Sequence, residues 1–145
     1  MKFKYDYREG QIYLIRFADC HKVGYSKNLH YRIGRYEKKY EEQKKELLWL
    51  EQFDYVFLAL LAEHVLCQVF RPYRHLNRRE WIHPKISEVE IMQCMEIIAD
   101  AIRQDFANPQ YLNWYKCGMR DANKKRIFEK IKEACNVILD CSSSV

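Results

Sequence analysis

Three short apolar segments in the first third of the chain are typical of β-strands. Residues 11–17, QIYLIRF, are rich in β-branched and aromatic side chains and short enough for one strand. After a turn at residues 18–20, residues 21–26, HKVGYS, are predicted to pair with that strand as a hairpin. Residues 47–53, LLWLEQF, are predicted to return as a third strand.

Four longer segments favour helices. Apolar residues recur at spacings of three and four over residues 28–45, and residues 56–70 form an apolar run too long for a typical strand. Further helices are expected over residues 86–104 and 121–139, with a basic loop at residues 71–80 and a polar tail after residue 140. The pattern predicts an α+β fold, with a small three-stranded antiparallel sheet flanked by helices. Residues 1–104 form the expected domain, and residues 105–145 form a C-terminal helical extension packed on it.

Composition supports one folded domain. The 145 residues are 48% hydrophobic and include only 4 Gly and 3 Pro, which excludes disorder over most of the chain. No stretch approaches 18 uncharged apolar residues, and the first residues do not resemble a secretory signal. We therefore expect an intracellular protein, cytoplasmic or nuclear, with no membrane partner.

The net charge of +5 is concentrated in two windows. Residues 16–45 contain nine Lys or Arg against four Asp or Glu, and residues 71–85 contain five against one. Either window alone is more often a solvated basic face, but together they predict a groove for a phosphate backbone. The candidate nucleic-acid-binding residues are Lys27, Arg35, Arg71, Arg74, Arg78 and Arg79.

The six cysteines are scattered and form no CxxC pair, which favours reduced, buried thiols. A zinc site made from Cys20-His21 and His64-x-x-Cys67 is the alternative that this spacing leaves open.

Glu63 interrupts an otherwise apolar helix. On a helical wheel, His64, Gln68 and Arg71 form the natural solvent stripe, and Glu63 lies about 100° from His64. A carboxylate there is partly desolvated and needs compensation. An arginine partner is the ordinary explanation, and a hard metal ion such as Mg²⁺ is the alternative.

The hairpin carries residues that are unremarkable one by one. Tyr13 shares a strand face with Ile15, and Lys22 lies in the facing strand, followed by Gly24, which permits close backbone approach. A packed aromatic and a solvated lysine are their usual roles. Arg32, in the first turns of the next predicted helix, suits phosphate binding but alone is more often an ordinary surface arginine.

Taken together, these residues resemble the opening of the GIY-YIG nuclease superfamily. Its first motif is similar to Gln11-Ile12-Tyr13, with Gln in place of Gly, and its second is similar to Lys22-Val23-Gly24. Arg32 falls where the family has its catalytic arginine, and Tyr36 falls four residues later at the family's His/Tyr position. Lys22 replaces a tyrosine, as in some active restriction-type members.

The resemblance continues to about residue 102. Glu63 looks like the lone metal-binding glutamate of the family, and Asn77 looks like the asparagine that follows that helix. Glu80-Trp81-Ile82 is similar to a stretch found in a phage- and virus-associated subgroup.

The resemblance implies a metal-dependent endonuclease that acts on DNA, with Mg²⁺ or Mn²⁺ as cofactor. Tyr13 would be the general base, its pKa lowered from about 10 by Lys22. Arg32 would hold the phosphate, Glu63 would bind the metal, and Tyr36 would position water. A homodimer would be one way to cut both strands.

Two alternatives stay open. The chain could be a catalytically silent member of the same family that binds nucleic acid, or a small viral effector whose C-terminal helices bind a protein.

Overall fold

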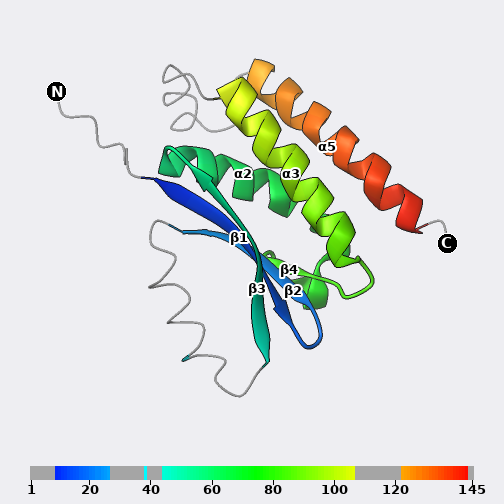
Figure 1. The fold of residues 1–145 in the computed structure, drawn as a ribbon. Helices are drawn as coiled ribbons and strands as arrows, with labels where there is room; N and C mark the ends of the chain where they lie inside the picture. The colour runs from blue at the N-terminus through cyan, green and yellow to red at the C-terminus, as the bar shows by residue number, and fades with distance from the viewer. Residues whose placement is uncertain (1–8, 27–37, 39–43, 107–121, 144–145) are drawn as a thin grey trace.

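The computed structural model describes residues 9–26, 38, 44–106 and 122–143. In chain order, the strands are β1 (Gly10–Phe17), β2 (His21–Ser26), β3 (Lys45–Phe53) and β4 (Trp81–Ile82). The helices are α2 (Val56–Val69), α3 (Glu88–Phe106) and α5 (Ala122–Ser143), with short 3-10 helices η1 (Arg71–Tyr73) and η2 (His75–Asn77). The fold is therefore α+β, as the sequence predicts (Figure 1).

The predicted hairpin is confirmed and lies at the centre of the sheet. The strand order is β3-β1-β2-β4, and every pairing is antiparallel. Tyr13 faces Gly24 across the hairpin, and Ile15 faces Lys22. Because β1 has a strand on each side and is covered on both faces, its run of apolar residues is almost completely buried.

The predicted end of the helix over residues 28–45 is wrong, because β3 already begins at Lys45. Residues 27–37 and 39–43 lie outside the described residues. Lys45 pairs with Phe17 and Glu46 pairs with Arg16, so the first residues of β3 are held by the end of β1. An ion pair of 2.7 Å between Arg16 and Glu46 reinforces this pairing. Local helical spacing could not predict these contacts, since they depend on a distant strand.

The predicted three-stranded sheet is also corrected, because the described part of the chain forms four strands. Trp81 pairs with Lys22 and Ile82 pairs with His21, which adds β4 to the outer edge of β2. The backbone N–H of Val23 donates to the carbonyl of Glu80 at 3.0 Å, one residue before β4. A two-residue strand is too short to show alternation, so its sequence shows only an apolar pair.

The three labelled helices lie on one side of the sheet (Figure 1). Ile12, Leu14 and Val23 point to this side and join the core formed with apolar residues of α2, α3 and α5. On the opposite face, a smaller cluster contains Tyr13, Ile15, Phe17, Cys20 and Trp81. The alternation of β1 thus divides its side chains between the main core and the candidate site.

The predicted solvent stripe of α2 is only partly exposed. The ring of His64 lies 6.2 Å from that of Phe128 on α5, and its Nε2 contacts Gln68 at 2.9 Å. Only Arg71, beyond the helix, is exposed. Helix α5, which runs to Ser143 rather than 139, partly covers the face of α2 that would otherwise meet water. Within the described residues, none of the helices has the length and apolar character needed to cross a membrane.

Candidate functional site

Tyr13 and Gly24 are in close contact across the hairpin. A Cβ built on Gly24 would lie 2.5 Å from the hydroxyl of Tyr13 and 2.7 Å from its Cζ, so the ring occupies the space above the glycine. The close approach that the sequence predicts at Gly24 is therefore confirmed. Tyr13 is only 1% exposed and packs with Ile15 and Trp81. Its phenol is held in one place by the strand pairing and by this apolar cluster.

Lys22 lies on the same face of the sheet as Tyr13, but it is not the solvated charge that its sequence would usually suggest. The residue is 8% exposed, and its Nζ lies 3.1 Å from a carboxylate oxygen of Glu80. The same Nζ lies 5.1 Å from the centre of the Trp81 ring, and the guanidinium of Arg78 lies 4.5 Å from that ring. Lys22 is thus a buried cation whose charge is shared between a carboxylate and an aromatic face.

Glu63 is buried in α2, as its apolar helical neighbours predict. It is 4% exposed, its Oε1 accepts a hydrogen bond from the Cys67 thiol at 3.3 Å, and the guanidinium of Arg79 lies 3.7 Å away. Burial raises the pKa of the Glu63 carboxyl above its usual range, and the negative charge of Glu80 raises it further. The thiol and Arg79 oppose this shift. The carboxylate is therefore only partly compensated and would gain from a closer cation.

Residues 79–81 connect these groups into one cluster. Arg79 reaches Glu63, Glu80 binds Lys22 through its side chain and Val23 through its carbonyl, and Trp81 lies beside Lys22. We call Lys22, Glu63, Arg79 and Glu80 the charged cluster; it holds two carboxylates and two cations. Its Lys22 lies beside Trp81, which also packs with Tyr13 on the face of the sheet opposite the helices.

Glu80 and Trp81 were not among the predicted site residues. The only sequence signal for them is the Glu-Trp stretch within the resemblance described above. Their contact with Lys22 depends on the pairing of β4 with β2, which brings together residues far apart in the sequence.

The basic loop over residues 71–79 leads into the charged cluster. Arg71, Arg78 and Arg79 are exposed, whereas Arg74 is half-buried and forms a backbone bridge with Ile82. Asn77 lies exposed at the end of η2, so its side chain is not part of the buried cluster. Two of the four predicted arginines of this segment contact the site, Arg78 at the Trp81 ring and Arg79 at Glu63. The other predicted residues, Lys27, Arg32, Arg35 and Tyr36, lie outside the described residues.

A second polar cluster lies at the end of the hairpin next to its turn. The guanidinium of Arg16 binds both carboxylate oxygens of Glu88 and also Glu46, and His21 Nε2 lies 3.0 Å from Glu88. The hydrogen bond from Arg16, followed by that from His21, lowers the pKa of Glu88 to about 2. This network ties α3 to the sheet, which is a structural role.

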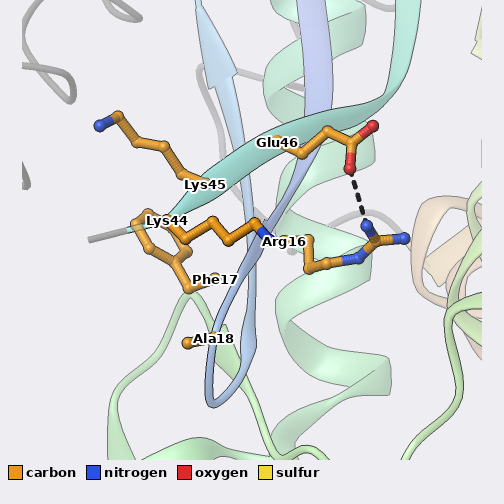
Figure 2. A pocket seen from close by; sticks show the side chains of 6 residues that line it. All are labelled: Arg16, Phe17, Ala18, Lys44, Lys45 and Glu46. Atoms are coloured by element: carbon orange, nitrogen blue, oxygen red, sulfur yellow. Dashed lines mark hydrogen bonds and ion pairs between the residues drawn. The ribbon is translucent and has the colours of Figure 1, made fainter.

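A basic hollow adjoins this second cluster (Figure 2). Its volume is about 340 Å³, and it is lined by Arg16, Phe17, Ala18, Lys44, Lys45 and Glu46. The ring of Phe17 also lies 5.0 Å from that of Trp81, so the hollow and the charged cluster share one apolar wall. Arg16 is engaged by Glu46 in the same view, and Lys44 and Lys45 also line the hollow (Figure 2).

The cysteines within the described residues are reduced and buried, as their spacing predicts. Cys20, Cys67, Cys94 and Cys135 are free thiols and buried. The described residues form no zinc site, because no three of their His, Cys, Asp or Glu side chains gather around a common point. Cys67 instead donates to Glu63, and burial raises the pKa of its thiol to about 12.

Comparisons of the chain with models of protein families, with curated proteins and with solved structures gave no match.

Proposed function

We propose that this protein is a metal-dependent endonuclease that hydrolyses phosphodiester bonds in DNA. The observation that carries this proposal is the charged cluster: two carboxylates and two cations lie together beside an arginine-rich loop, and the buried phenol of Tyr13 packs with Trp81, the neighbour of Lys22. Phosphodiester hydrolysis needs a base, cations for the phosphate and help for the leaving oxygen. The resemblance to the GIY-YIG nucleases assigns the base to Tyr13 and the metal to Glu63, and it assigns the phosphate cation to Arg32, which lies outside the described residues.

In this proposal, Tyr13 removes the proton from the attacking water. Lys22 lies on the same sheet face and favours the phenolate, although its charge is shared with Glu80 at 3.1 Å. Arg32 binds the non-bridging phosphate oxygens and Tyr36 orients water. Arg71, Arg74, Arg78, Arg79, Lys27 and Arg35 hold the DNA backbone by charge.

Glu63 is the residue that would hold Mg²⁺ or Mn²⁺. A single carboxylate with water and substrate oxygens is a common ligand set for Mg²⁺, and the partly compensated charge of Glu63 favours a cation there. Glu80 is near enough to raise the Glu63 pKa and could supply a second oxygen. The bound ion would neutralise charge on the leaving oxygen. Arg79 has to leave its 3.7 Å position for this, which frees it for the phosphate.

The same geometry supports a second candidate, a catalytically silent protein that binds nucleic acid. Tyr13 and Glu63 are both almost fully buried, and the two carboxylates of the cluster each have a cation partner. A cluster that is already paired can serve stability and leave the arginine-rich loop as the functional surface.

Nicking of a supercoiled plasmid distinguishes these candidates. With Mg²⁺ or Mn²⁺, the wild-type protein is expected to convert the plasmid to the open circle, and Glu63→Ala and Tyr13→Phe are expected to stop conversion while DNA binding is kept. Glu96→Ala, at an exposed glutamate of α3, is the matched control and should cut normally. Binding without cutting by the wild type supports the silent protein. Absence of any salt-dependent DNA binding refutes both and leaves a protein-binding effector.

A further inference from the structure

Leu76 projects from the basic loop into solvent. Its side chain is 73% exposed, more than any other large apolar side chain in the described part of the chain. It lies within η2, between Arg74 and Arg78. A leucine at such a position contributes nothing to the core and would ordinarily be replaced by a polar residue without loss of stability.

The backbone at this position is unfavourable for leucine. Leu76 has φ 52° and ψ 32°, and Asn77 follows with φ 57°, so two consecutive residues adopt the left-handed conformation. Asparagine tolerates this region, but a bulky side chain does so only where the surroundings impose it. Strained backbone of this kind is concentrated at binding and catalytic sites.

The surroundings do impose this conformation. The N–H of Arg78 donates to the carbonyl of His75 at 3.1 Å, which closes the turn around Leu76. On one side, the N–H of His83 donates to the carbonyl of Tyr73 at 2.6 Å, and on the other the Arg78 guanidinium lies on the Trp81 ring. The loop therefore holds Leu76 outward from a fixed base rather than leaving it free to fold back.

The charges around Leu76 indicate its partner. Arg71, Arg74, Arg78 and Arg79 flank it in sequence, whereas a protein-binding anchor would be surrounded by further apolar side chains. Proteins that deform duplex DNA use this combination: cations hold the phosphates while one apolar side chain enters the stack between two base pairs.

We propose that Leu76 is a wedge that separates neighbouring base pairs of a bound DNA duplex, and that the preferred substrate is a duplex with an easily unstacked step. This inference rests on the proposed function. Leu76 is three residues from Arg79, which contacts Glu63, so the two Cα atoms are at most about 11 Å apart. That distance corresponds to roughly three base steps. The distortion would therefore lie within about three base steps of the phosphate that Arg79 holds.

The test uses the full chain, without divalent metal, and DNA duplexes that carry 2-aminopurine, whose fluorescence rises when its neighbours unstack. The wild type is expected to raise the fluorescence at saturation and to bind a mismatched duplex about tenfold more tightly than a matched one, since a mismatch lowers the energy of unstacking. Leu76→Ala should abolish both effects and keep the same dependence of binding on salt, because the arginines remain. Leu76→Met should restore both. Leu50→Ala, at another exposed leucine (46% exposed, on β3), is the matched control and should behave as wild type.

Two results overturn the wedge. The first is a fluorescence rise that Leu76→Ala does not change, and the second is wild-type DNA binding with no rise and no preference for the mismatch. Binding of the wild type to anionic lipid vesicles but to no duplex would overturn it too, in favour of a membrane contact through Leu76. A failure of the wild type to bind any DNA refutes the proposed function itself, whereas normal DNA binding with either of the first two results refutes the wedge alone.

Discussion

Replacement of Gly24 by alanine is expected to push Tyr13 out of position. The new methyl carbon would lie 2.5 Å from the Tyr13 hydroxyl and 2.7 Å from Cζ, about 1 Å closer than carbon atoms normally approach. Tyr13 is almost fully buried, so the ring cannot simply swing into solvent. The φ of Gly24 lies outside the left-handed region, so the close approach of the ring alone requires glycine here.

The size of the effect follows from two opposing contributions. Overpacking of a core site typically lowers stability by about 1–3 kcal/mol. Alanine is more favourable than glycine inside a strand by about 0.5–1 kcal/mol, which offsets part of this loss. We expect Gly24→Ala to lower the free energy of unfolding by about 1–2 kcal/mol, with a shift of the urea midpoint of about 1 M or less.

A double-mutant cycle separates the clash from other effects. Leucine has none of the Tyr13 atoms that the methyl group would meet, which are the hydroxyl, Cζ and Cε2, so in a Tyr13→Leu background Gly24→Ala should be neutral or stabilising. Urea unfolding of the four proteins measures the coupling. In the plasmid assay, Gly24→Ala should also cut about a hundredfold more slowly, because the phenol is displaced. Equal effects of Gly24→Ala in both backgrounds would refute the placement of the ring over Gly24.

Three further predictions follow from the titratable groups. The pKa of Glu63 is raised in the native state, so the charged carboxylate weakens the fold as pH rises. Glu63→Gln should therefore raise the urea midpoint at pH 7, and this gain should disappear below pH 4.5. The same substitution should stop DNA cutting. A lower midpoint at pH 7 would contradict this. The pKa of Glu88 is lowered to about 2, so the stability that its carboxylate contributes is present above the unfolded value of 4.5 and is lost as pH falls toward 2. When urea unfolding is measured as a function of pH, Glu88→Gln should remove this loss of stability at acid pH. An unchanged loss of stability at acid pH would count against the network. Burial raises the Cys67 pKa to about 12, so alkylation at pH 8, followed by peptide mass spectrometry, should label Cys67 only after unfolding, and rapid labelling of the native protein would contradict its burial.

The local features of this fold could be predicted from the sequence. The alternation of β1 assigns Tyr13 and Ile15 to one face, and the apolar neighbours of Glu63 indicate its burial without any knowledge of the tertiary structure. Both predictions depend only on the periods of a strand and a helix.

The charged partners could not be predicted in the same way. Lys22 reads as a solvated lysine because Glu80, its partner, is distant in the sequence and is brought close only by the pairing of β4 with β2. An arginine partner for Glu63 is a reasonable expectation, but nothing local selects Arg79 from the other arginines. Leu76 likewise becomes noticeable only once its backbone angles and exposure are known.

The most direct test of the charged cluster as a metal-dependent nuclease site is the position of Mn²⁺ in crystals of the full chain, located by anomalous scattering. The proposal predicts an ion about 2 Å from a carboxylate oxygen of Glu63, with Arg79 displaced from its 3.7 Å contact. An ordered ion at other carboxylates, with Glu63 still paired to Arg79 and no ion beside it, would contradict the proposal.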